Sequence, residues 1–501
     1  MGLSVPSSAT LSAGVNAKTA YNLKGDGSTD DSAALWNAIS TEVANGIANG
    51  TYFARLFFPA GIYMLNGSYV QGGATRGNAI VPLPIMPVTG QKFVLELVGA
   101  GDATSLPHWH QTVTQQSGTV FKTTRTDGSN DASGRTFNNG VTTNNSAVVT
   151  SATAAFVATD IGRYVTGAGI PLGTWIASRQ SATQVTLSQN ATATATGVSI
   201  TLSGFGEASI LGGPTPAEGY GPSWSISDPL FSNMLLYIDG IAFVYPANST
   251  VSGLDARCLA EFNFGRLGSQ ADQNPPTATI PAHTWQFGLG MPQTGNNDNC
   301  NGVWYSCEGA YFPILVGEHT CIQSMRAIYC ADGIFCQDGT SFHGAWIGYA
   351  SIEACAVCLN VSASNTYSKI VIDVLDYEDG AGGFAPQAHI YDPGNRLYGS
   401  VGLQTNDTPF APIVTGAANL DIKSLQAGKG AVTAPAVPAS TVAYQNTFWR
   451  DAAVTITGGT VTAITVDGVV TGLTSGTVIV PSGKTISWTG AAAPTWKWWL
   501  F

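Results

Sequence analysis

A short repeat between residues 301 and 378 restricts the fold more than any other feature of the sequence. Apolar segments that alternate with polar residues recur there at intervals of little more than twenty residues, at 304–311, 328–335, 348–357 and 370–378. This period corresponds to one coil of a parallel β-helix and is too short for a propeller blade. The repeat therefore predicts a solenoid whose coils stack strand on strand.

The composition agrees with a strand-rich solenoid. Only 10% of the residues are charged, against about 25% in ordinary globular proteins. Glycine is abundant, with 59 residues, and 44% of the chain is hydrophobic. Few charges together with many small and β-branched residues favour sheets and turns over surface helices, and the apolar share is large enough to form a core.

The charge balance argues against two classes of partner. The formal net charge is −11 and no basic run is present. Nucleic acids and anionic membrane surfaces both require clustered Lys and Arg, so neither is expected to bind. The first residues lack the basic and apolar regions of a signal peptide. No stretch approaches eighteen uninterrupted apolar residues, so we expect no membrane insertion.

The cysteines are concentrated in the region of the repeat. Cys355 and Cys358 form the one pair with CxxC spacing, and no matching pair accompanies them. Zinc is therefore not expected, and neither is any other metal or cofactor. We interpret the cysteines as small buried residues stacked inside the solenoid. The eight are Cys258, Cys300, Cys307, Cys321, Cys330, Cys336, Cys355 and Cys358.

Two separated motifs mark the start of the solenoid. A turn rich in Gly and Asp, residues 25–31, precedes a predicted helix in which Leu35, Ile39 and Val43 keep helical spacing. Asp30, Asp31 and Ser32 are the candidate N-caps. Residues 55–65 then predict a buried strand, a Pro-Ala-Gly turn and a second strand.

These motifs resemble the opening of the pectate lyase superfamily domain. The matching residues are Gly25-Asp26-Gly27, Thr29-Asp30-Asp31, Ala34, Ala38-Ile39 and Phe58-Pro59-Ala60-Gly61-Ile62-Tyr63. The resemblance implies a right-handed parallel β-helix capped by an N-terminal helix. It also implies that the three Asp residues are structural rather than catalytic.

Changes in residue composition and pattern along the chain predict the domain boundaries. Residues 137–204 alternate Thr and Ala with apolar residues, which predicts an inserted antiparallel β-module, similar to modules of phage tail proteins. Residues 437–501 predict a small β-domain for oligomerisation or glycan binding, which resembles C-terminal modules of phage tail proteins. The expected order is an arm (1–17), a helix with the first coils (18–136), the inserted module (137–204), the main β-helix (205–400), a linker (401–436) and the C-terminal domain (437–501).

Acidic and aromatic side chains accompany the repeat. One carboxylate lies near the same phase of each coil, so neighbouring acids would stand roughly 5 Å apart and the next ones roughly 10 Å apart. These values bracket the carboxyl separations of glycosidases. The candidate catalytic acids are Glu308, Asp332, Glu353, Asp376 and Glu378, with Asp332 and Glu353 as the favoured pair. The candidate substrate-binding residues are Trp304, Tyr305, Arg326, His343, Trp346 and Tyr349.

Alternative interpretations remain open for each of these residues. Acid-Gly pairs such as Glu308-Gly309 and Asp332-Gly333 mark turns. About half of the aromatic residues should be core, because strand residues alternate between the two faces. His319 lies in the same region. Residues 296–299, rich in Asn and Asp, could hold Ca²⁺ but lack a calcium-loop pattern, so a polar turn is favoured.

The whole arrangement resembles a phage tailspike or tail-fibre protein. The resemblance implies a homotrimer on the virion tail, joined to other tail proteins through the N-terminal arm, which binds and endo-cleaves a bacterial surface polysaccharide. Hydrolysis by paired carboxylates is favoured over lyase chemistry, because no pectate lyase catalytic pattern is present. A non-catalytic receptor-binding protein that grips a surface glycan is the main alternative, because the fold does not decide between them. A secreted bacterial enzyme is a third.

Overall fold

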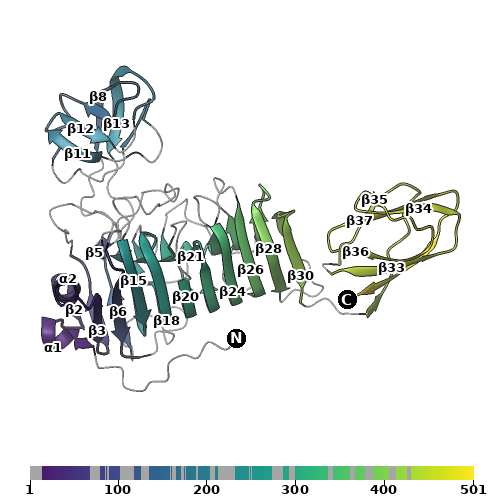
Figure 1. The fold of residues 1–501 in the computed structure, drawn as a ribbon, viewed down its shortest axis with the longest axis horizontal. Coiled ribbons are helices and arrows are strands. Elements are labelled where there is room, and N and C mark those ends of the chain that lie inside the picture. The colour runs from purple at the N-terminus through teal and green to yellow at the C-terminus, as the bar shows by residue number, and fades with distance from the viewer. Residues whose placement is uncertain are drawn as a thin grey trace.

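The computed structural model describes residues 14–67, 79–84, 86, 90–101, 118–125, 135–157, 160, 165–170, 174, 176–187, 190–202, 209–212, 232–246, 249, 251–272, 286–292, 300–336, 342–361, 367–378, 387–405, 413–425, 430–448 and 450–501. The described part of the chain is built mainly of β-strands (Figure 1). Neither of its helices is long and apolar enough to span a bilayer.

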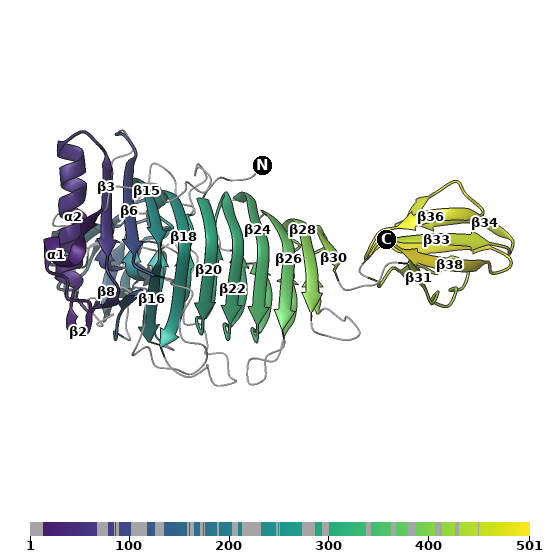
Figure 2. The ribbon, with the colours of Figure 1, turned by 90° about the horizontal axis from the view of Figure 1, so that it is seen from below.

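Two long parallel sheets run side by side along one axis and form the β-helix (Figures 1 and 2). The first sheet follows the order β1 (Val15–Asn16), β3 (Phe53–Phe58), β6 (Phe93–Gly99), β15 (Ser232–Asp239), β18 (Leu259–Asp272), β20 (Cys300–Glu308), β22 (Thr320–Ile328), β24 (Phe342–Glu353), β26 (Ser368–Glu378), β28 (Leu397–Thr405) and β30 (Leu420–Ser424). Its early coils add β2 (Asp26–Asp30), β4 (Gly61–Met64), β7 (Thr119–Lys122) and β16 (Ile241–Pro246).

The second sheet closes each coil on the opposite side. It contains β5 (Ala79–Pro82), β14 (Ser209–Gly212), β17 (Ser252–Asp255), β19 (Phe287–Gly290), β21 (Phe312–Val316), β23 (Asp332–Cys336), β25 (Val357–Val361), β27 (Ala388–Asp392) and β29 (Val414–Gly416). The strand pairings along the described part of this sheet are parallel and join consecutive coils, as in the pair β23 and β25. The solenoid core lies between the two sheets.

Alternation of side chains explains why these segments form strands around one core. In β15, every second residue from Ser232 is buried, and Met234, Leu236 and Ile238 belong to the solenoid core. The residues between them are partly exposed and face outward, which is the pattern of a strand with one buried face. Consecutive coils place the inward residues in register, so one continuous apolar core runs through the stack.

A helix closes the N-terminal end of the core. Helix α2 (Ser32–Ala48), preceded by the short α1 (Ala17–Tyr21), buries Leu35, Ile39 and Val43 against the first coil. The Asp31 carboxylate accepts hydrogen bonds from the backbone N–H groups of Lys24 and Gly25 at 2.6 and 2.9 Å. Gly25 has φ +55°, and a Cβ there would meet the Tyr63 ring at 2.9 Å. The Gly-Asp motif therefore builds the capping turn, as its structural interpretation predicts.

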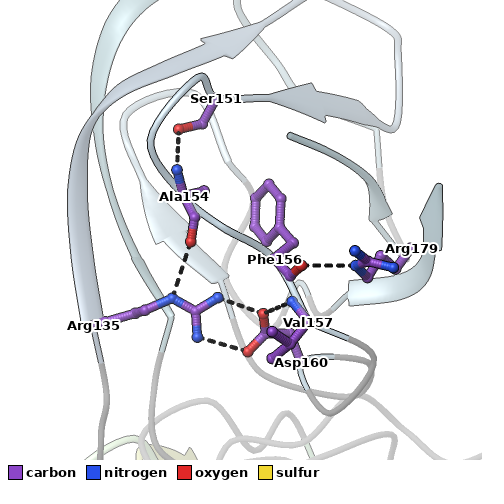
Figure 3. Close-up of polar contacts among 7 residues, drawn as sticks. All are labelled: Arg135, Ser151, Ala154, Phe156, Val157, Asp160 and Arg179. Carbon is purple, nitrogen blue, oxygen red and sulfur yellow. Dashed lines mark hydrogen bonds and ion pairs between the residues drawn. The ribbon is translucent and has the colours of Figure 1, made fainter. Parts of the chain in front are cut away.

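The inserted β-module is a separate antiparallel body beside the first coils (Figure 1). Its strands are β8 (Arg135–Thr142), β9 (Val148–Thr150), β10 (Val165–Gly167), β11 (Ile176–Ser181), β12 (Gln184–Leu187) and β13 (Ala195–Leu202). Figure 3 shows the buried Asp160 carboxylate bound by the Arg135 guanidinium through both oxygens. Arg135 Nε also donates to the Ala154 carbonyl, so this group fastens the segment after β9 to the sheet.

The C-terminal domain is a sandwich of two antiparallel sheets beyond β30 (Figure 1). One sheet has the order β31 (Gly430–Val432), β38 (Thr495–Leu500), β33 (Ala452–Thr457) and β36 (Gly476–Val480). The other has the order β32 (Tyr444–Gln445), β37 (Thr485–Gly490), β34 (Val461–Val466) and β35 (Val469–Val470). Together with the capping helix and the inserted module, this sandwich confirms the predicted fold class, a right-handed parallel β-helix carrying both small β-modules.

The segment expected to be a linker, 401–436, differs from that expectation. Strands β29 and β30 add a further coil, in which Leu420 pairs with Gly399 and Val414 pairs with Ile390. Leu420 and Ile422 are buried in the solenoid core. The Gly and Ala content suggested a linker, but two inward apolar residues suffice to hold the last coil. At the far end of the same segment, β31 pairs with β38 of the sandwich.

The cysteines lie as expected inside the solenoid. Seven of the eight are buried, and Cys321 is partly exposed on the outer side of β22. Burial raises the pKa of the Cys307, Cys330 and Cys358 thiols well above its usual range. They therefore act as packing groups rather than as thiolate nucleophiles.

Candidate functional site

The outer face of the first sheet, over β20 to β26, carries most of the predicted site residues. Strand β24 shows how its residues are divided between the core and the outer face. The residues buried in the solenoid core are Ala345, Ile347, Ala350 and Ile352. Trp346, Tyr349, Ser351 and Glu353 alternate with them and lie on the outside. The strand pairs in parallel register with β22 and β26, so outward residues of neighbouring coils form rows along the axis.

One such row holds three of the five predicted acids. Glu308 pairs with Ile328, Ile328 with Glu353, and Glu353 with Glu378. Glu353 and Glu378 are therefore direct neighbours, whereas Glu308 stands two coils away from Glu353. Burial, together with the charges of Glu353 and Glu308, raises the pKa of Tyr329. The Tyr329 side chain thus lies close to both glutamates.

A second row adds a cation and another acid. It runs from Ser306 through Arg326 and Ser351 to Asp376. Arg326 Nη2 lies 3.5 Å from Glu353 Oε2, with both side chains only partly exposed. The structure therefore brings Arg326, Glu353, Asp376 and Glu378 onto one part of the sheet.

Two aromatic rings of β24 are fixed by acids of the next coil. The Trp346 indole N–H donates to Asp373 Oδ2 at 3.0 Å, and the Tyr349 hydroxyl donates to Asp376 Oδ2 at 2.9 Å. A Cβ added at Gly348 would meet the Trp346 ring at 3.0 Å, so the indole lies across this glycine. Tyr349 remains 39% exposed, enough to contact a ligand.

Asp373 is a site residue that the sequence analysis missed. Its signal lies in β26, where exposed residues alternate with buried ones from Lys369 through Val371 to Asp373. That parity places Asp373 on the outer face beside Asp376. The choice of one acid near the same phase of each coil did not include it.

Trp304 and Tyr305 separate onto opposite faces of β20. Trp304 pairs with Arg266 and Ser324 on the outer face and is partly exposed. Tyr305 is fully buried in the solenoid core, where its hydroxyl donates to the Pro313 carbonyl at 2.6 Å. The substrate-binding role predicted for Tyr305 is therefore wrong, because no ligand on the outer face could reach its ring.

Asp332 does not belong to the row of acids. It is the first residue of β23 in the second sheet, pairs with Val357, and is only 7% exposed. The Asn360 amide donates to its Oδ2 at 2.8 Å. Desolvation by burial raises the pKa of Asp332 to about 7. The favoured pair of Asp332 and Glu353 is thus divided between two sheets.

Other candidates lie outside the face or outside the described residues. The described residues place His343 on β24 but do not define its side chain, and 296–299 fall outside them. His319 Nε2 lies 3.9 Å from Glu318 Oε1 in a turn before β22. No group of three or more His, Cys, Asp and Glu side chains in the described ranges could hold a metal ion.

We call the outer-face group of Arg326, Trp346, Tyr349, Glu353, Asp376 and Glu378 the acid-aromatic face. Its chemistry suits a sugar ligand, because exposed rings offer a flat apolar surface while carboxylates and a guanidinium offer hydrogen bonds. Two adjacent carboxyl groups additionally permit acid/base chemistry. Asp376 also positions the Tyr349 ring, which leaves Glu353 and Glu378 as the adjacent acid pair.

Comparison with known proteins supports the family resemblance for the N-terminal part. Residues 14–254, just under half of the chain, match the family model described as rhamnogalacturonase A/epimerase, pectate lyase-like. No curated protein matches the chain significantly. Among solved structures, the gp54 tailspike of Acinetobacter baumannii bacteriophage AP22, in complex with A. baumannii capsular saccharide, is 10% identical, with 97% of this chain and 96% of that chain covered and a TM-score of 0.19.

A second solved structure gives a similar result. The tailspike protein gp49 from Pseudomonas phage LKA1 is 13% identical, with 97% of this chain and 99% of that chain covered and a TM-score of 0.22. Scores this low do not establish a common overall arrangement for either tailspike. The family match stands by itself: residues 14–254 are similar to the pectate lyase-like family, in agreement with the resemblance of the paired motifs around Asp30 and Pro59.

Proposed function

We propose that this chain is a tailspike-like depolymerase that binds a bacterial surface polysaccharide on the acid-aromatic face and cleaves it within the chain by carboxylate hydrolysis. The observation that carries the proposal is the pairing of Glu353 with Glu378 in the same register, beside Arg326 and the two anchored rings. The pectate lyase-like match of residues 14–254 supports a role in polysaccharide processing.

The spacing of the two glutamates favours a retaining reaction. Neighbouring strands lie about 4.8 Å apart, close to the roughly 5–5.5 Å between the carboxyl groups of retaining glycosidases. Arg326 lies beside Glu353, so we assign Glu353 the carboxylate role and Glu378 the proton-donor role. Glu353 attacks the anomeric carbon while Glu378 protonates the leaving oxygen and the glycosidic bond breaks. Water then releases the sugar from Glu353, with Glu378 accepting the proton.

The aromatic rings would hold the polymer for this reaction. Trp346 and Tyr349 are each fixed by a carboxylate of the following coil. Rings that are already fixed lose little conformational entropy when a sugar binds, so less of the binding free energy is spent on ordering them. Trp304, two coils before Tyr349 in the same row, extends the surface along the solenoid axis.

The same hydrogen bonds favour a second candidate, a non-catalytic glycan-binding tail protein. Asp373 and Asp376 would hold the two rings in place in an enzyme and in a binding protein alike. Binding alone needs no acid that reacts with the substrate. A lyase would use Arg326 to neutralise a uronate. Analysis of products from host surface polysaccharides separates the three: new reducing ends indicate hydrolysis, unsaturated uronates indicate a lyase, and intact polymer that remains bound indicates a binder.

Substitution of the two glutamates tests the assignment of residues. Glu353→Gln and Glu378→Gln keep shape and remove charge, and each should lower cleavage by about a hundredfold or more, the low end for general acid–base catalysis. Asp421→Asn is the matched control, because Asp421 is an exposed acid on the outer face of β30 near Lys423. Normal cleavage by both glutamate variants would move the active site elsewhere.

The partners proposed from the tailspike resemblance concern assembly. We propose a homotrimer on the virion tail, attached to other tail proteins through the N-terminal arm, residues 1–17, of which 1–13 lie outside the described residues. Light scattering should give three times the chain mass at working concentration. A monomer mass would contradict the trimer without affecting the cleavage assay.

A further inference from the structure

The C-terminal sandwich exposes a tryptophan on the outer side of one sheet. In β38, Trp496, Trp498 and Leu500 are buried between the two sheets, and the residues between them face outward. Trp499 is one of these outward residues and is 57% exposed. More than half of this side chain is in contact with water, and an exposed apolar surface of this kind is typical of a site that binds a ligand or a partner.

The residues beside Trp499 leave its ring open. Its partners on the two adjacent strands are Ala431 and Ala453, and Ala453 pairs in turn with Ile479, which is 49% exposed. Two alanines are too short to cover an indole. The row therefore presents a broad flat apolar surface in the middle of a four-stranded sheet.

Polar groups occupy the next outward row of the same face. Lys497, two residues before Trp499, pairs with Thr455, which pairs with Thr477. The hydroxyls of Thr455 and Thr477 lie 2.9 Å apart. Lys497 is exposed, and no ion pair of this side chain occurs among the described residues. Hydroxyl and ammonium donors thus lie beside the flat ring.

We propose that this surface, Trp499 with Lys497, Thr455 and Thr477, is a second saccharide-binding site that takes an acidic polysaccharide. A pyranose ring would stack on Trp499, its hydroxyls would hydrogen-bond the threonines, and its carboxylate would bind Lys497. Charge complementarity supports this ligand, because strands β31, β38, β33 and β36 contain one Lys and no Asp or Glu, in a chain of net charge −11. For the identity of the polymer, the site rests on the proposed function.

The absence of carboxylates from these four strands also defines what the site does. Hydrolysis by the mechanism above needs an acid and a base, and neither is present on this sheet. The site therefore binds without cleaving. It would hold the polymer near the acid-aromatic face and raise its effective concentration there.

Binding to a printed array of purified acidic and neutral bacterial surface polysaccharides tests the site in the full chain. Trp499→Ala should lower binding to acidic glycans about tenfold or more, and Lys497→Gln should lower it less. Val470→Ala is the matched control, because Val470 is 63% exposed on the other sheet. Because all three residues are exposed, the fold should persist, which thermal unfolding can verify.

Three outcomes would overturn the proposal. Trp499→Ala could bind every glycan as well as the wild type, the wild type could bind only neutral glycans, or the variant could show a smaller particle mass by light scattering. The last result would make the surface a contact between copies of the chain. Cleavage of short soluble oligosaccharides keeps the two proposals apart: cleavage that persists in Trp499→Ala supports the acid-aromatic face whatever happens to array binding.

Discussion

The two parallel sheets of the solenoid are made by the same coils, yet they place their residues in opposite environments. Strands β20 and β22 of the first sheet alternate buried and accessible residues. Every residue of β21 and β23 in the second sheet is buried. Phe287, Phe312 and Phe335 form an apolar cluster of their own beside the main core. One sheet thus keeps a face for ligands, and the other is used for packing.

This difference decides what a carboxylate can do. Glu353 lies near Arg326 on the accessible sheet, whereas Asp332 is buried and accepts a hydrogen bond from the neutral amide of Asn360. Burial raises the pKa of Asp332 to about 7. A raised pKa of this size is found both in general acids and in acids that are merely desolvated. Location on the packing sheet favours the second explanation for Asp332.

The largest expected effect is a change in the pH dependence of stability in Asp332→Asn, which distinguishes a general acid from a desolvated acid. The pKa of Asp332 is raised in the folded chain from a reference value of 3.8, so the folded state binds the extra proton. The stabilisation by this proton is fully present below pH 4. It is lost as the pH rises through about 7, where the free energy of unfolding falls by about 4 kcal/mol at most. Asp332→Asn should therefore unfold at a higher temperature than the wild type at pH 8, and the difference should shrink toward pH 4.

Thermal unfolding of both proteins between pH 4 and 8 measures this difference, and cleavage is assayed on the same samples. Asn can still accept the Asn360 hydrogen bond through its carbonyl oxygen, so the packing is kept. We expect cleavage to stay within a few fold of the wild type. A loss of a hundredfold or more in cleavage, with an unchanged pH dependence of stability, would instead make the second sheet the catalytic one.

The second effect concerns the anchored tryptophan. Gly348→Ala places a Cβ about 3.0 Å from the Trp346 ring and 2.7 Å from the Gln323 carbonyl oxygen. The ring must shift, which weakens its hydrogen bond to Asp373. We expect about tenfold weaker polysaccharide binding, which corresponds to about 1.4 kcal/mol. Gly344→Ala is the control, because a Cβ there meets nothing within 4 Å. Equal affinities for the two variants would show that Trp346 does not contact the polymer.

The sequence predicted the solenoid well because its coils repeat and because inward residues must be apolar. It predicted the phase of the acids less well, because the coils differ in length. Glu308 is followed by its register partner Ile328 after 20 residues, and Ile328 by Glu353 after 25. Taking one acid from each coil therefore led from Glu308 to Asp332, which lies four residues beyond the equivalent position and already on the other sheet.

Local irregularity explains the error at Tyr305. Strict alternation along β20 is interrupted where Val303 and Trp304 both lie on the outer side. From that point the parity of the strand is reversed, so Tyr305 turns inward. Nothing in the residue types announces this shift, since Trp and Tyr are equally suited to a core or to a sugar surface. The burial pattern of β20 reveals it.

The smallest effect tests whether Asp376 positions the Tyr349 ring or acts on the substrate itself. Tyr349→Phe removes the hydroxyl that donates to Asp376 Oδ2 and keeps the ring. A hydrogen bond at a partly exposed position contributes about 0.5–1.5 kcal/mol, so we expect a loss of about threefold, seen in KM rather than in kcat. Asp376→Asn should lose no more than that, because its amide oxygen can still accept the hydrogen bond from Tyr349. A hundredfold fall in kcat for Asp376→Asn, with Tyr349→Phe almost unaffected, would place Asp376 beside Glu353 as a reacting acid in place of Glu378.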